Sequence, residues 1–230
     1  MHKYFSTNNV NFLDIVGLTG YPFNPANVTK FLQRTDITDT VSLNKYFSKW
    51  RTKFQFENHS KLRNQDIVVS AQYDYEVNNI LIFVSSKKGI KFVNMTDTKK
   101  SKLEYDITLA VMHEMIHRKQ FHHRHDYNDY HYVFRKTGDK KLDEEYTYYS
   151  DVDEVFAYAH CIYSELKTEY PDLSITEIMK KRKLHSPILA TYRGMYTKSS
   201  DTFSQLHKEI FRWERKYNEV IGERVSKQSR

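Results

Sequence analysis

Apolar residues recur at steps of three and four along several stretches of the chain, which is the spacing of a helix with one buried face. The pattern is clear in residues 42–57, where the recurring side chains are Leu43, Tyr46, Phe47, Trp50 and Phe54. It is equally clear in residues 202–225, where they are Phe203, Leu206, Ile210, Trp213 and Tyr217. We predict a helix in each of these stretches and a shorter one at 27–34.

The segment 66–93 has a different pattern, with short runs of β-branched and aromatic residues on either side of polar turn formers. Residues 67–73 and 80–84 predict the two strands of a β-hairpin, with Asn78 and Asn79 in its turn. Residues 89–93 are a predicted third strand. The sequence therefore predicts a small β-sheet that precedes the middle of an otherwise helix-rich chain.

A buried helix is predicted in the middle of the chain. Ser101 and Glu104 have the spacing of a capping box, which places the start of this helix. The residues that follow are apolar on several sides of the helix: Leu109, Val111, Met112, Met115 and Ile116. A helix with so much apolar surface is expected to be buried. After His117 the chain is polar and dense in histidine, so we predict that it leaves the helix there.

A second strong helix is predicted after a polar loop at 136–143. Ser150 is its predicted N-cap, because acidic residues follow in the first turn. Its apolar stripe consists of Val155, Ala159, Ile162 and Leu166. Pro171 predicts the end of this helix, and a capping box formed by Ser174 and Glu177 predicts a further short one.

Composition limits the class of protein. The chain has 230 residues, of which 39% are hydrophobic, enough for a substantial core. Its single cysteine, Cys161, excludes an intramolecular disulfide framework. No run approaches the roughly 20 apolar residues that span a bilayer, and the N-terminus lacks the pattern of a signal peptide. We therefore expect a cytoplasmic protein that does not bind membranes.

These observations together predict an α+β fold in a single domain over residues 1–230. Within it we expect N-terminal helices and the small sheet at about 27–95. Metal-binding helices are expected at about 101–170, and C-terminal helices at about 174–225.

Candidate chemistry is concentrated in the pentapeptide His113-Glu114-Met115-Ile116-His117, which has the pattern H-E-x-x-H. In a helix, His113 and His117 lie about 40° apart around the axis, and Glu114 lies about 60° from His117. Two neutral imidazoles on one side of a helix bind Zn²⁺, which lowers the pKa of a bound water towards about 7. Glu114 is placed to take a proton from that water as a general base. Zn²⁺ is therefore the predicted cofactor.

A catalytic zinc ion needs a third protein ligand, and the sequence offers three candidates. His123 lies six residues beyond His117 and resembles in its spacing the third histidine of metzincins. That family, however, has a glycine where Gln120 stands, because the chain must turn sharply there. His131 lies further along the chain. Glu154, at the start of the second helix, is the preferred candidate, although a carboxylate there could equally serve the helix N-terminus.

Two segments, 112–124 (MHEMIHRKQFHHR) and 148–166 (YYSDVDEVFAYAHCIYSEL), together resemble the gluzincin-type zinc metallopeptidases encoded by large tailed bacteriophages. Residues 186–196 (SPILATYRGMY) are similar to the C-terminal part of those proteins. The resemblance covers about the C-terminal half of the chain. It implies a zincin-like domain in the host cytoplasm, with Glu114 as the catalytic base. The zinc ligands that it implies are His113, His117 and Glu154.

A second resemblance involves His131, which is similar to the distant third histidine of SprT-like peptidases. In those proteins an aromatic residue follows this histidine shortly, as Phe134 does here. The resemblance implies a peptidase that acts on DNA-bound proteins, with His131 in place of Glu154 as the third ligand.

The predicted function is that of a zinc-dependent metallopeptidase, with proteins or peptides as substrates. The alternative is a nucleic-acid-associated protein with a structural zinc site, which the formal net charge of +7 and the basic side of the predicted 42–57 helix favour. Such a site would be closed by four protein ligands. Tyr158 and Tyr192 are candidates for stabilising an oxyanion, but with 18 tyrosines the sequence assigns neither. No feature of the sequence indicates an oligomeric state.

Overall fold

The computed structural model describes residues 40–48, 51–58, 67–86, 95–124, 131, 132, 134, 136–181, 184 and 186–228. Within these residues the chain forms seven helices and one three-stranded sheet, which confirms the predicted α+β, helix-rich class. The described residues divide into two compact units, one up to residue 122 and one from residue 123 onwards. The single domain over 1–230 stays a prediction.

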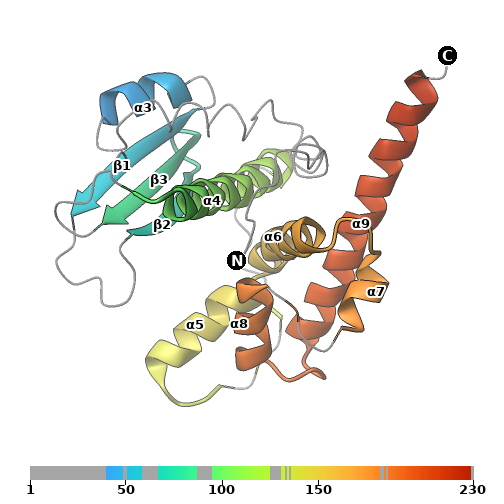
Figure 1. The fold of residues 1–230 in the computed structure, drawn as a ribbon. Helices are drawn as coiled ribbons and strands as arrows, with labels where there is room; N and C mark the ends of the chain where they lie inside the picture. The colour runs from blue at the N-terminus through green and yellow to red at the C-terminus, as the bar shows by residue number, and fades with distance from the viewer. Residues whose placement is uncertain are drawn as a thin grey trace. The chain divides into compact units, whose positions relative to one another are not determined.

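The first unit contains the sheet and two helices (Figure 1). Its elements in chain order are α3 (Thr40–Phe47), β1 (Thr52–Asn58), β2 (Ile67–Asp74), β3 (Asn79–Ser86) and α4 (Asp97–Arg124). In the sheet, the order of strands is β1-β3-β2, so that β3 is central. β1 runs parallel to β3, and β2 runs antiparallel to it. The buried side chains of β3 alternate, with Ile80, Ile82 and Val84 at most 1% exposed.

The predicted helix at 42–57 is wrong in its second half, which is the strand β1. Helix α3 ends at Phe47, and Arg51 adopts a positive φ of 53° in the turn that leads into the strand. Asn44 then clamps the strand: its Oδ1 accepts the Phe54 N–H at 2.6 Å, and its Nδ2 donates to the Phe54 carbonyl at 3.2 Å. Thr52 and Phe54 are buried while Lys53 between them is exposed, the alternation of a strand. Buried Thr52 and Phe54 fit the two-residue period of a strand. The four-residue spacing of Tyr46, Trp50 and Phe54 in the sequence fits a helix equally well.

The predicted β-hairpin is confirmed as β2 and β3, joined by a turn at 75–78. Asn78 has a positive φ of 52°, a conformation that asparagine tolerates better than most residues. The predicted helix at 27–34 and the predicted third strand at 89–93 lie outside the described residues. Among the described residues, the third strand of the sheet is β1.

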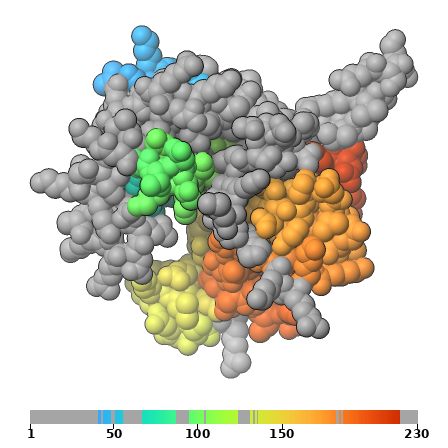
Figure 2. Space-filling view, viewed as in Figure 1, coloured from blue at the N-terminus to red at the C-terminus, as the bar shows by residue number. Residues whose placement is uncertain are grey.

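Helix α4 starts earlier and ends later than predicted. It begins at Asp97, with Thr96 as its cap, whose Oγ1 accepts the Lys99 N–H at 3.4 Å. Ser101 therefore lies inside the helix instead of capping it. The beginning of α4 is exposed, as the green atoms in Figure 2 show, whereas residues 111–118 are buried.

The prediction that the chain leaves the helix after His117 is also wrong, because α4 continues to Arg124. The added turns are held by packing: the Phe121 ring lies 6.1 Å from the Tyr73 ring and 5.6 Å from the Tyr75 ring, centroid to centroid. No glycine or proline interrupts residues 118–124. Packing of Phe121 on the hairpin therefore supports the helix beyond His117.

The second unit is helical. It contains α5 (Lys140–Ser150), α6 (Val152–Glu169), α7 (Ile175–Met179), α8 (Pro187–Met195) and α9 (Asp201–Gln228). Helices α6 and α9 pack together, and the Trp213 Nε1–H donates to the Phe156 carbonyl at 3.3 Å. The predicted apolar stripes of both helices are buried, as are the small residues Ala157 and Ala159. The stripes are Val155, Ala159, Ile162 and Leu166 in α6, and Phe203, Leu206, Ile210, Trp213 and Tyr217 in α9.

The predicted N-cap of α6 is wrong by one residue, since Asp151 caps the helix and Ser150 ends α5. The predicted loop at 136–143 is likewise only partly a loop, because Asp139 caps α5 and accepts the Leu142 N–H at 3.1 Å. The capping box of Ser174 and Glu177 is confirmed at the start of α7, and α6 ends before Pro171 as predicted. In the described part of the chain, no helix combines the length and apolar character needed to cross a bilayer.

Candidate metal centre

The H-E-x-x-H residues occupy the buried middle of α4, where His113, Glu114 and His117 are only 7–8% exposed. The two imidazoles face each other: their Nε2 atoms are 3.0 Å apart, and the ring planes are inclined by 75°. Two nitrogens bound to one tetrahedral zinc ion at about 2.0–2.1 Å would be about 3.3 Å apart. The predicted helical spacing therefore brings both Nε2 atoms close enough together to bind one metal ion.

Gln120 orients one of these rings. Its Oε1 lies 3.0 Å from Nδ1 of His117, one turn back along the same helix. Because an amide oxygen only accepts, this contact requires the proton of the neutral ring to be on Nδ1. The Nε2 atom of His117 then presents its lone pair, as a metal ligand must.

Substitution of Gln120 by alanine is expected to weaken zinc binding by about 10–100-fold, because the tautomer and orientation of the His117 ring are then no longer held. The dissociation constant for zinc, measured by competition with a chromogenic chelator, checks this expectation. Lys119→Ala changes an exposed neighbour on the same helix and should bind zinc like the wild type. Equal affinities of the Gln120 and Lys119 variants would show that the amide does not support the site.

Glu114 is attached to the sheet. Its Oε2 accepts the backbone N–H of Tyr73 in β2 at 2.7 Å, a contact between residues 41 positions apart. Tyr73 is paired with Ile80 of β3, whose own N–H donates to the carbonyl of Arg51, the residue directly before β1. The Tyr73 N–H therefore points away from β3, to the outer edge of β2, where Glu114 receives it. The carboxylate is thus fixed in orientation next to a strand edge.

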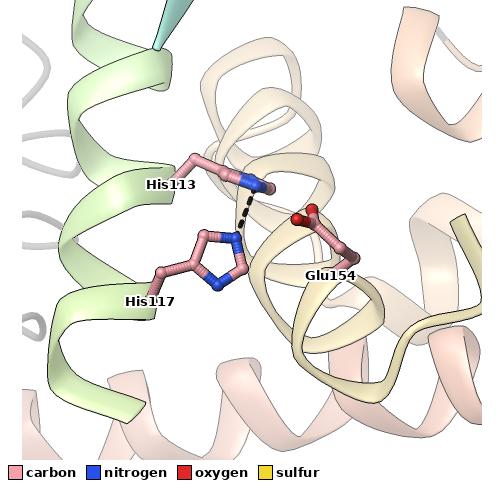
Figure 3. Close-up of side chains that lie close together, drawn as sticks. All are labelled: His113, His117 and Glu154. Atoms are coloured by element: carbon pink, nitrogen blue, oxygen red, sulfur yellow. Dashed lines mark hydrogen bonds between the residues drawn. The ribbon is translucent and has the colours of Figure 1, made fainter. Parts of the chain in front are cut away.

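Glu154 completes a set of possible ligands. One ligand atom from each of His113, His117 and Glu154 lies within 4.8 Å of the others, and Figure 3 shows these three side chains. Among the described residues, these three side chains form the one group of three or more histidine, cysteine or acidic residues that is close enough to hold a metal ion. Two imidazoles and one carboxylate are a donor set that suits catalytic zinc. The residues present therefore fit a metal ion.

The start of α6 is defined by Asp151, whose Oδ1 accepts the N–H groups of Asp153 and Glu154 at 2.8 and 3.1 Å. The Asp151 carboxylate therefore supplies the negative charge and the hydrogen-bond acceptor that stabilise the helix N-terminus. Glu154 is not needed for that role. His131 pairs with Asp151 in a β-bridge, and its Nδ1 lies 3.9 Å from Oδ2 of Asp151. The choice between Glu154 and His131 as third ligand stays a prediction.

His123, the third candidate, lies on α4. Since the helix continues past His117, His123 is about 120° further around the axis and about 9 Å further along it. Its side chain is exposed. The sharp turn that would bring it back to the His113 and His117 pair does not occur.

Tyr158 and Tyr192 belong to an aromatic cluster in the second unit, with ring centroids 6.0 Å apart. Burial raises the pKa of both hydroxyls well above the usual range, and neighbouring groups, among them the Glu154 carboxylate, raise it further. Both phenols therefore stay protonated and can act only as neutral hydrogen-bond partners near Glu154. Their assignment to an oxyanion stays a prediction.

Two contacts at the candidate site have no counterpart in the predictions from sequence. The contact of Gln120 with His117 follows from their spacing, because residues three positions apart lie on one face of a helix. The bond between Glu114 and the Tyr73 backbone left no sequence signal, because any residue except proline supplies that N–H.

Comparisons of the chain with protein-family models, with curated proteins and with solved structures find no match. The resemblances to gluzincin-type and SprT-like peptidases therefore stay predictions. What can be inferred about function depends on the side chains described above.

Proposed function

We propose that this protein is a zinc-dependent metallopeptidase that hydrolyses peptide bonds in protein or peptide substrates. The observation that carries the proposal is the buried turn of α4, where His113 and His117 bring their Nε2 atoms to within 3.0 Å and Glu114 lies beside them. Burying two imidazoles and a carboxylate in one turn of a helix costs free energy of desolvation. A metal site that uses both imidazoles as ligands and the carboxylate as a base gives all three residues a role that offsets this cost.

Zinc held by His113, His117 and Glu154 would act as a Lewis acid towards the substrate carbonyl and would lower the pKa of water towards neutrality. Glu114 is the general base in this proposal. It takes a proton from the attacking water as the water oxygen bonds to the carbonyl carbon. It then gives that proton to the amide nitrogen as the C–N bond breaks. The bond from the Tyr73 N–H holds the carboxylate in place for both transfers.

The alternative of a structural zinc site in a nucleic-acid-associated protein has less support. A structural site is closed by four protein ligands, whereas the group found among the described residues has three. The basic helical face that favoured nucleic acid is also interrupted, since Lys45 lies in α3, Arg51 in a turn and Lys53 in β1.

Removal of zinc with a chelator is expected to abolish hydrolysis of an unfolded protein substrate, and addition of Zn²⁺ is expected to restore it. The measurement is the appearance of new peptides by mass spectrometry, together with the zinc content of each sample. A circular dichroism spectrum of the chelated protein serves as the control for folding. Unchanged hydrolysis by protein shown to be free of metal would contradict the proposal.

A further inference from the structure

The turn between β2 and β3 exposes apolar side chains on a rigid support. Tyr75 is 49% exposed and Val77 is 57% exposed. The turn below them is held by Asp74, whose Oδ1 accepts the N–H groups of Glu76 and Val77 at 3.1 and 3.3 Å. The Tyr73 hydroxyl adds a bond to Asn78 Oδ1 at 3.2 Å. The apolar groups are therefore presented to solvent by an ordered turn.

Phe121 of α4 extends this surface, because its ring lies 5.6 Å from the ring of Tyr75. We call Tyr75, Val77 and Phe121 the hairpin-tip surface. Single exposed apolar side chains are ordinary. Here, however, two of four turn residues are exposed and apolar, and they adjoin an aromatic ring on the helix that carries Glu114.

The hairpin-tip surface lies in line with the proposed catalytic base. Phe121 is seven residues after Glu114, which is about 10 Å along α4 and about 20° around it. Along β2, Tyr75 follows Tyr73 by two residues, and the Tyr73 N–H is the group that holds Glu114. An extended peptide advances about 3.3 Å per residue. The distance of about 10 Å from Glu114 to Phe121 along α4 therefore corresponds to about three residues of an extended peptide.

We propose that the hairpin-tip surface binds a bulky apolar or aromatic side chain of the substrate, about three residues from the scissile bond. The substrate class is then an extended peptide with such a side chain at that distance. This inference rests on the proposed peptidase function. Tyr75 and Phe121 gain contact area with an aromatic ring at little cost in conformational entropy, because the turn and α4 already hold them in place.

Two sets of peptides test the proposal, identical except for phenylalanine or serine three residues from the scissile bond, on one side of the bond or on the other. The wild type is expected to prefer phenylalanine in one set by about 10-fold in kcat/KM. In the double variant Tyr75→Ser, Val77→Ser this preference should fall to about 2-fold or less. Val41→Ser removes an apolar side chain that is 77% exposed on α3 and should keep the wild-type preference.

A double variant that keeps the full preference for phenylalanine overturns the inference while leaving the peptidase proposal in place. A wild type that cleaves both sets without preference does the same. If the wild type cleaves no peptide, the peptidase proposal fails. Binding of fluorescein-labelled phenylalanine and serine peptides to zinc-loaded Glu114→Gln protein then decides whether the surface recognises an apolar side chain, and equal binding of the two overturns that as well.

Discussion

Replacement of Glu114 by glutamine is expected to lower kcat for peptide hydrolysis by about 10²–10⁴-fold, the usual contribution of a general acid–base group. The amide cannot take the proton from water or return it to the leaving amine. It keeps the shape of the side chain, and its Oε1 can still accept the Tyr73 N–H that Glu114 accepts at 2.7 Å. Initial rates with a fluorogenic peptide, at saturating substrate, measure the effect.

Two controls accompany the Glu114→Gln variant. Its zinc content should equal that of the wild type, because Glu114 is the proposed base and not a ligand. Its unfolding midpoint in urea should change little, because the bond to the sheet is preserved. A variant that binds zinc and still cleaves at the wild-type rate would falsify the role of Glu114.

The second large effect concerns the metal itself. Loss of a proposed ligand in His113→Ala or Glu154→Ala is expected to reduce zinc affinity by more than the roughly 10–100-fold that an outer hydrogen-bond partner costs. After dialysis against a weak chelator, both variants should contain far less zinc than the wild type. Elemental analysis of the dialysed proteins gives the result directly.

His123→Ala is the matched control for those variants, because it removes an imidazole that is exposed on the same helix. His131→Ala discriminates between the two resemblances. If it empties the site while Glu154→Ala keeps zinc, the third ligand is a histidine, and the SprT-like hypothesis replaces the gluzincin-type one. If only Glu154→Ala loses zinc, the carboxylate is the ligand.

The pairing of His113 and His117 could be predicted from the sequence, because it depends on the period of one helix and on nothing distant. The same holds for the apolar stripes of α6 and α9 and for the capping box of α7, which are local patterns in single elements. The hairpin was equally local, since two β-branched runs flank a turn that contains Asn78 and Asn79.

The predicted element boundaries are wrong where two local signals compete or where tertiary packing determines the secondary structure. Thr96 and Ser101 can both cap a helix, and only the structure shows that Thr96 does. Ser150 and Asp151 compete in the same way at α6, where the carboxylate accepts two N–H groups. In residues 52–57 the spacing of Phe54 fitted a helix, but strand pairing with β3 and the Asn44 clamp favour the extended chain. The continuation of α4 past His117 is accompanied by contacts of Phe121 with Tyr73 and Tyr75, which no local pattern contains.

The contact between Glu114 and the Tyr73 backbone also makes the hairpin a reporter of the proposed base. An amide at the edge of a sheet usually exchanges its hydrogen with solvent quickly, whereas this one is bound by a buried carboxylate. The exchange rate of the Tyr73 amide hydrogen is therefore expected to be slow while Glu114 accepts the N–H and faster when that hydrogen bond is broken. Hydrogen exchange at the Tyr73 amide in β2 thus reports whether the Glu114 carboxylate in α4 is hydrogen-bonded to the strand.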